Sequence, residues 1–350
     1  MKVFSNLANM LLVMISVFFS LFCLEAYLVL ASRSNVDLKE VYMVLNGNRY
    51  HFIEDKEAFQ NIKKAIVFIG DSFTVGLKCG NKNNFPGQFR KLLNDNSIDL
   101  STINLGVGDT GIFSYLERVN DFISTFESPA AIIVTLYMND IKFDPISCKY
   151  IDLMVKDSLL NDKDYVKLSS YCKQEEEIRY NSGNQRIRIF HRWITKNFHS
   201  YRFLRDEMLK MLIALGYDIK WGRRNYAQKW EQHNGLNFKL IMFAIKKMKQ
   251  ISDNYKVPLI IVIYPDVGFI SNENPFVGIY KSVSEKLATE LFVPVYSGYE
   301  AFLSQHDQRD IPSSMIWSVT DHHPNCEAHH VFASWIFNKL ISNGTFSNCL

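Results

Sequence analysis

The 350-residue chain lacks an excess of charge of either sign, an internal repeat and a low-complexity tract. Its 39 Lys and Arg nearly balance 36 Asp and Glu, which gives a formal net charge of +3. A protein whose main partner is nucleic acid usually carries a strongly basic face, so the near-neutral balance argues against that class of partner. The composition is that of a globular protein, large enough for one domain with an insertion or for two domains.

The cysteines include no C-x-x-C pair, so the spacing of a zinc knuckle or of a dithiol redox site is absent. The six are Cys23, Cys79, Cys148, Cys172, Cys326 and Cys349. Cys148 and Cys172 can form a disulfide if this part of the chain lies in an oxidising compartment, and free buried thiols are the alternative. Cys79 and Cys326 are expected to be packed thiols.

The amino terminus carries a long apolar stretch, Met10 to Ala31, which only two serines and Glu25 interrupt. Because a bilayer core needs about 20 apolar residues, we interpret residues 1–32 as a membrane anchor. The carboxylate of Glu25 lies near the end of the stretch, where it can be protonated or reach the interface. A cleaved signal peptide is the alternative, since small residues precede Ser32. The flanking charges favour a single-pass protein with an extracytoplasmic body, in the periplasm or at the cell surface.

Short apolar runs alternate with helix-like segments along the rest of the chain. Strands are expected at Ala65–Ile69, Ile103–Leu105, Ala130–Leu136, Val257–Tyr264 and Phe292–Tyr296. Helices are expected at Asn84–Asn94, Tyr115–Phe126, Phe238–Tyr255, Val277–Glu290 and Ala328–Ile341. This alternation predicts an α/β fold, in which helices cover both faces of a parallel sheet. Before it, residues 33–64 are expected to be an irregular lead-in with a turn at residues 46–48.

A long segment without strand patterns, at about residues 141–235, separates the third and fourth predicted strands. From Arg186 to Arg224 it is rich in Lys, Arg, Phe, Tyr and Trp and poor in acidic residues. We interpret it as a helical insertion. Its basic face is either merely solvated or functional, as a lid, a cradle for an anionic glycan or a surface on acidic lipid headgroups.

Four stretches of polar residues are predicted to meet at one edge of the sheet. They are Gly70-Asp71-Ser72 after the first strand, Gly106-Val107-Gly108 after the second, Asn139-Asp140 after the third, and Asp321-His322-His323 before the last helix. In open α/β sheets, ligands bind at the carboxyl ends of the strands. A serine there can be a nucleophile, although Gly, Asp and Ser also form ordinary turns and helix caps.

The residue types at this edge match the needs of acyl transfer at a serine. The hydroxyl needs an imidazole to take its proton, and the imidazole needs a carboxylate to fix its tautomer. The oxyanion that forms needs backbone and amide donors, each worth about 3 kcal/mol of the barrier.

In this order, the four stretches resemble the motif blocks of the SGNH (GDSL-type) hydrolase superfamily. Gly70-Asp71-Ser72-Phe73 is similar to its first block, Gly108-Asp109-Thr110 to its second, Asn139-Asp140 to its third and Asp321-x-His323-Pro324-Asn325 to its last. The resemblance covers about residues 65–342 apart from the insertion, so we assign residues 65–350 to one hydrolase domain. It implies a flavodoxin-like three-layer sandwich, here with five parallel strands, and neither a metal nor an organic cofactor.

The resemblance also implies roles for single residues. Ser72 would be the nucleophile, His323 the general base and Asp321 its orienting partner. The backbone N–H groups of Ser72 and Gly108 and the side chain of Asn139 would form the oxyanion hole.

Two positions depart from the family pattern. The chain has Tyr137 where a glycine usually stands two residues before the asparagine, and Asp321 is two rather than three residues before His323. His322 is therefore an alternative base, less favoured because Pro324 and Asn325 follow His323.

The leading hypothesis is a membrane-anchored esterase or deacylase that removes acyl groups, such as O-acetyl, from a cell-envelope glycan or lipid. An O-acyltransferase that uses the same serine is one alternative. A metal-dependent phosphoesterase built on the histidines around His323, including His329 and His330, is another, disfavoured because too little chain follows for its second domain. A binding module without catalysis is the last.

Overall fold

The computed structural model describes residues 16, 20–25, 27, 41–45, 48–52, 62–108, 110–126, 128–137, 139–140, 146–180, 204, 207–208, 211, 235–265, 276–303, 315–316, 323–342 and 344. The chain divides into two compact units. One unit comprises Lys39–Cys172 and Lys220–Leu350 and contains the sheet. The other comprises Met1–Leu38 and Lys173–Ile219, and its described residues are helical.

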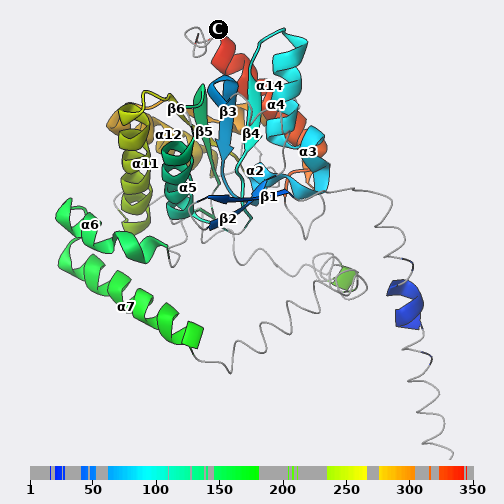
Figure 1. Cartoon of the computed structure of the whole chain (residues 1–350). Coiled ribbons are helices and arrows are strands. Elements are labelled where there is room, and N and C mark those ends of the chain that lie inside the picture. The colour runs from blue at the N-terminus through cyan, green and yellow to red at the C-terminus, as the bar shows by residue number, and fades with distance from the viewer. Residues whose placement is uncertain are drawn as a thin grey trace, which may run out of the picture. The chain divides into compact units, whose positions relative to one another are not determined.

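Five parallel strands form the central sheet (Figure 1). They are β3 (Ala65–Ile69), β4 (Ser101–Asn104), β5 (Ala131–Leu136), β6 (Leu259–Ile263) and β7 (Val295–Ser297). Every residue of β3, β5 and β6 is buried, as expected of parallel strands that are covered on both faces. The five predicted strands and their parallel arrangement are confirmed.

The strand order is β4-β3-β5-β6-β7, so the chain moves one way from β3 to β4 and then returns to the other side of β3. This is the flavodoxin-like order, which the family resemblance implied. In such sheets the reversal opens a crevice beyond the carboxyl ends of the strands on either side of it, here β3 and β5.

Helices form a layer on each face of the sheet (Figure 1). One layer holds α4 (Phe85–Asp95) and α14 (Cys326–Ser342), and the other holds α5 (Ile112–Thr125), α11 (Leu236–Asn254) and α12 (Phe276–Leu291). On the first face, Phe68 of β3 packs edge-on against Phe85 at 5.0 Å and Phe89 at 5.3 Å between ring centroids. The three-layer arrangement is confirmed.

An antiparallel hairpin precedes the sheet in the chain. It consists of β1 (Val41–Leu45) and β2 (Asn48–Phe52), paired from Val41 with Phe52 to Leu45 with Asn48. The expectation of an irregular lead-in is wrong for these residues. An Asn-Gly pair between two short strands is a strong local hairpin signal, and residues 46 and 47 of the predicted turn lie outside the described residues.

The insertion begins with η3 (Ser147–Tyr150), α6 (Ile151–Lys156) and α7 (Asp162–Tyr180). A disulfide joins Cys148 to Cys172, with Cα atoms 5.9 Å apart, so the disulfide alternative for this pair is confirmed. The basic, aromatic segment from Arg186 to Arg224 lies almost entirely outside the described residues.

Most of the apolar stretch from Met10 to Ala31 also lies outside the described residues. Among the helices that the structure does describe, none combines the length and the apolar character that a bilayer crossing requires.

The contact between α14 and the sheet yields a stability prediction. Phe332 is fully buried, and its ring centroid lies 4.7 Å from that of Phe85 and 4.1 Å from that of Tyr264. Phe332→Ala is expected to lower the free energy of unfolding by about 3–5 kcal/mol, because it removes apolar contacts and leaves a cavity. Urea unfolding with the disulfides intact measures this loss.

Phe292 provides the matched control, since it is 86% exposed. Phe292→Ala is expected to change the free energy of unfolding by less than about 1 kcal/mol. Similar losses in both variants would contradict the assignment of Phe332 to the core.

Candidate active site

A sharp turn at the end of β3 presents Ser72. Asp71 caps the short helix α2 (Ser72–Val75), and its Oδ1 accepts a hydrogen bond from the Phe73 N–H at 2.9 Å. Asp71 therefore stabilises the turn, as capping residues do. Gly70 precedes it at a position where an added Cβ would lie 2.0 Å from Thr74 Oγ1, so no larger residue fits. Ser72 is half-buried at the amino terminus of α2.

The structure brings His323 to this turn from the far end of the chain. His323 Nε2 lies 2.8 Å from Ser72 Oγ, although 251 positions separate the two residues. In the tautomer that is protonated on Nδ1, the Ser72 hydroxyl donates to Nε2, which is the geometry of a nucleophile and its general base. The imidazole is exposed, so a substrate can reach it.

Two buried aromatic rings support the imidazole. The Phe73 ring lies 5.0 Å from the His323 ring between centroids, and Tyr137 stacks on Phe73 at 3.7 Å. Tyr137 is the position at which the family usually has a glycine. Here its ring fills the space beside Phe73, and its backbone N–H donates to Asp140 Oδ2 at 2.6 Å.

Two of the expected oxyanion-hole residues lie around Ser72. A Cβ added to Gly108 would lie 3.7 Å from Ser72 Cβ, so the second motif block passes directly beside the serine. Asn139 follows β5, and its side chain donates a hydrogen bond to the Asp71 carboxylate.

A buried arginine, which the sequence analysis did not single out, makes hydrogen bonds to the segments that follow β3 and β4. Arg118 of α5 donates through Nη1 to the carbonyl oxygens of Leu105 at 2.6 Å and Gly70 at 3.0 Å. Its Nη2 donates to Thr110 Oγ1 at 2.8 Å. Arg118 therefore supplies donors to the chain where it leaves β3 and β4. The available sequence signal was its position three residues after Tyr115 and four before Phe122, on the apolar stripe of the predicted helix.

Two buried carboxyl groups, Asp71 and Asp140, lie close enough for their charges to interact. Burial raises the pKa of Asp140 well above its usual range, and the negative charge of Asp71 adds to this effect. Arg118 and hydrogen bonds from Tyr115 and Tyr137 oppose the rise. Burial also raises the pKa of Asp71, and the hydrogen bonds from Phe73 and Asn139 and the charge of His323 oppose this rise.

Two further histidines, His329 and His330, lie on α14. His329 is buried, and the pKa of its imidazole falls to about 3, chiefly through burial and also through the charge of His323. His330 Nδ1 lies 3.1 Å from Gln88 Oε1 on α4. Asp321 and His322 lie outside the described residues. Among the residues that the structure describes, no group of three or more His, Cys, Asp or Glu side chains could hold a metal ion.

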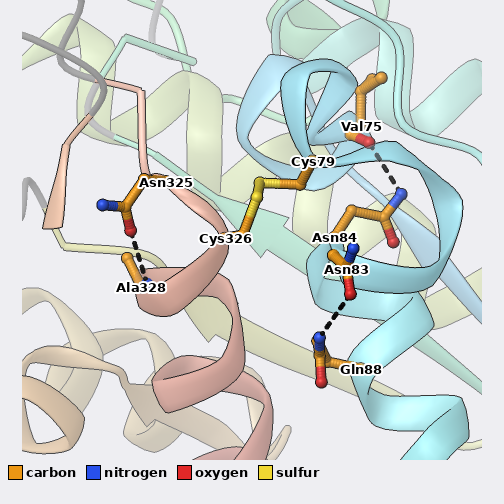
Figure 2. The surroundings of a disulfide bond; sticks show 8 residues. All are labelled: Val75, Cys79, Asn83, Asn84, Gln88, Asn325, Cys326 and Ala328. Atoms are coloured by element: carbon orange, nitrogen blue, oxygen red, sulfur yellow. Dashed lines mark hydrogen bonds between the residues drawn. A yellow bond between two sulfur atoms is a disulfide. The ribbon is translucent and has the colours of Figure 1, made fainter. Parts of the chain in front are cut away.

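Cys79 and Cys326 form a disulfide next to the site, with Cα atoms 5.3 Å apart (Figure 2). The expectation that they are packed thiols is wrong. The two cysteines are 247 positions apart, and only the folded chain brings their Cα atoms within the range of a disulfide. Cys79 ends η2 (Leu77–Cys79), and Cys326 begins α14.

Comparison with known proteins gives distant structural similarity only. The chain matches no protein-family model, and no curated protein matches it in sequence. It is similar to a psychrotrophic esterase from a Pseudoalteromonas species, with 10% identity, 80% of this chain and 97% of the other covered, and a TM-score of 0.41.

Two further solved structures are similar to the same extent. One is a member of the lipolytic protein G-D-S-L family from Veillonella parvula DSM 2008, with 12% identity, 79% and 96% coverage, and a TM-score of 0.39. The other is a catalytic mutant of an acetylxylan esterase from Geobacillus stearothermophilus, with 12% identity, 79% and 94% coverage, and a TM-score of 0.43. Similarities this distant carry no inference about the reaction or the substrate of this chain.

The raised pKa of Asp140 predicts a pH dependence of stability. Between the ordinary pKa of an aspartate and the raised value, the folded protein binds more protons than the unfolded chain. The free energy of unfolding therefore falls as the pH rises through that interval. Asp140→Asn removes this titration, so we expect a flatter dependence of the free energy of unfolding on pH above the ordinary pKa of an aspartate.

Urea unfolding at a series of pH values measures this slope. Asp95→Asn, on the exposed surface of α4, controls for the loss of one negative charge. Equal slopes for Asp140→Asn and the unchanged protein would contradict the prediction.

Proposed function

We propose that the chain is a serine esterase or deacylase, with Ser72 as nucleophile and His323 as general base. The observation that carries the proposal is the 2.8 Å separation of Ser72 Oγ and His323 Nε2 at the carboxyl edge of a parallel sheet. Gly108 and Asn139 lie around the same serine and support an oxyanion hole there.

In the first half of the reaction, Ser72 Oγ attacks the ester carbonyl carbon while His323 Nε2 takes the hydroxyl proton. The carbonyl oxygen gains a negative charge, which the N–H groups of Ser72 and Gly108 and the Asn139 amide stabilise. His323 then donates its proton to the leaving alcohol oxygen, and the acyl group remains on Ser72.

In the second half, a water molecule attacks the acyl carbon while His323 takes a proton from the water. The bond between the acyl carbon and Ser72 Oγ then breaks, His323 returns the proton to Ser72 Oγ, and the acid is released. In this proposal Asp321 accepts a hydrogen bond from His323 Nδ1 and stabilises the imidazolium. A sugar hydroxyl in place of water would give acyl transfer through the same residues, so product analysis distinguishes the two reactions.

The proposed substrate is an acyl ester, such as an O-acetyl group, on a cell-envelope glycan or lipid. Two disulfides support a body in an oxidising compartment, because disulfides are rare in the cytosol. The apolar stretch from Met10 to Ala31 supports a membrane anchor that holds this body at the envelope.

The first test of the mechanism replaces the nucleophile and the base. Ser72→Ala is expected to reduce hydrolysis of p-nitrophenyl acetate by at least about 10³-fold, because no other described group can form the acyl intermediate. His323→Ala is expected to cause a similar loss. Both variants should lose labelling by a fluorophosphonate probe and keep the melting temperature nearly unchanged.

His322→Ala is the matched control, since it removes the neighbouring imidazole. We expect it to lose far less activity than His323→Ala. Hydrolysis retained by Ser72→Ala would overturn the mechanism, and a larger loss in His322→Ala would reassign the base.

The second test concerns the anchor. Removal of residues 1–32 is expected to give a protein that stays in the supernatant after ultracentrifugation and hydrolyses p-nitrophenyl acetate at the rate of the full chain. The full chain should sediment with membranes. A truncated protein that still sediments with membranes would show that another part of the chain attaches it.

A further inference from the structure

The Cys79–Cys326 disulfide joins the two segments that carry the proposed nucleophile and base. Cys79 follows Ser72 by seven positions, and Cys326 follows His323 by three. Through the bridge, a short covalent path connects two residues that are otherwise 251 positions apart along the chain. Neither cysteine belongs to the reaction proposed above.

Local hydrogen bonds make the nucleophile side of this path rigid (Figure 2). Asn84 Nδ2 donates to the Val75 carbonyl at 3.0 Å, which holds the end of α2. The backbone N–H of Cys79 donates to the Gly76 carbonyl at 2.9 Å. Cys79 is itself buried. A constraint at Cys79 is therefore transmitted to Ser72 through a segment with little freedom.

Backbone contacts and a helix cap restrain the histidine side. Pro324 forms an isolated bridge with Ile316, and the Asn325 N–H donates to the Met315 carbonyl at 3.0 Å. Asn325 Oδ1 accepts from the Ala328 N–H at 3.0 Å, which caps the start of α14 (Figure 2). His323 is exposed, and Phe73 packs against its ring from one side. The bridge at Cys326 adds a covalent restraint directly after this segment.

The body of α14 has its own attachment to the fold. Phe332 packs against Phe85 at 4.7 Å, and Phe337 packs against Phe89 at 5.6 Å between ring centroids. These contacts lie one turn or more beyond Cys326. Without the disulfide, α14 keeps this packing, whereas its first turn and the preceding His323 gain freedom.

We propose that the Cys79–Cys326 disulfide is a positioning element of the active site, which holds His323 within hydrogen-bonding distance of Ser72. The proposal rests on the function proposed above. According to this proposal, ester hydrolysis depends on the bridge, whereas the overall fold forms without it. Cys79 and Cys326 are positioning residues, since they act through Ser72 and His323 rather than on the substrate.

The chain offers a matched control for this proposal. The Cys148–Cys172 disulfide joins η3 to α7 and closes a short loop of the insertion. The test compares Cys79→Ala/Cys326→Ala with Cys148→Ala/Cys172→Ala, since double substitutions leave no unpaired partner thiol. Alanine also adds no polar atom to the buried position of Cys79.

We expect Cys79→Ala/Cys326→Ala to lower kcat for p-nitrophenyl acetate at least tenfold, with KM within twofold of the unchanged protein. This split identifies an interaction that acts on the transition state rather than on substrate binding. The control pair should leave both constants within twofold. Cys79→Ala/Cys326→Ala should have a lower melting temperature, because the disulfide that it lacks spans 247 positions of the chain. The kinetics are therefore measured well below the melting temperature of this variant, where its far-UV circular dichroism should equal that of the unchanged protein.

Dithiothreitol provides an independent version of the test. It breaks the S–S bond by donating two electrons and two protons, which gives two cysteine thiols and the cyclic disulfide of the reagent. Treatment should reduce kcat of the unchanged protein and of the control pair, and should leave kcat of Cys79→Ala/Cys326→Ala unaffected. An unchanged protein that keeps its kcat after its disulfides are reduced would overturn the proposal. Without the reagent, a kcat of Cys79→Ala/Cys326→Ala equal to that of the unchanged protein, or an equal loss of kcat in Cys148→Ala/Cys172→Ala, would also overturn it.

A readout without catalysis separates this proposal from the esterase assignment. The imidazole proton resonances of His323, assigned through His323→Gln, should move in Cys79→Ala/Cys326→Ala and stay in place in the control pair. Resonances that stay in place in both variants would overturn the positioning role. If the unchanged protein neither hydrolyses esters nor reacts with a fluorophosphonate, the proposed function fails, and the resonances still decide whether the bridge positions His323.

Discussion

The hydrogen-bonding contact between Ser72 and His323 is the interaction on which the proposed chemistry depends. Ser72 follows the first strand of the sheet, and His323 precedes the last helix, so no local structure can bring them together. Their distance is set by the packing of α14 on α4 and by the order of the strands. The candidate site is therefore a property of the whole domain, and a change that loosens α14 from α4 acts on the chemistry as well as on stability.

A buried polar network supports the other side of the site. The chain leaves β3 at Gly70 and passes Leu105 after β4, and the carbonyl groups at both points need donors because they are away from water. Arg118 supplies donors to both, and its positive charge also acts on the buried Asp140. Removing Arg118 would take one donor from each carbonyl group and the compensating positive charge from Asp140, which costs more than the lost contact alone. Through Arg118, this network holds the segment after β3, which contains Ser72, next to the segment after β4, which contains Gly108.

The fold was predictable from the sequence because its strands are short apolar runs in a regular alternation with helices, and that pattern depends only on local spacing. Ser72, Gly108 and Asn139 could be placed together because parallel strands share one edge. Arg118 was missed because an arginine on a helix is usually exposed. The Cys79–Cys326 bridge was missed because cysteine pairing over 247 positions leaves no local pattern.

Tyr137 contributes to the support of the candidate base. Its ring stacks on Phe73, and Phe73 lies against His323, so Tyr137 adds support beneath the imidazole. The disulfide restrains the same histidine from along the chain, through Cys326. Because His323 is exposed, water competes with Ser72 for its ring nitrogen, so the contact depends on how the imidazole is held. The aromatic stack limits tilting of the ring, and the bridge limits translation of its backbone, so the two restraints act on different motions of one side chain.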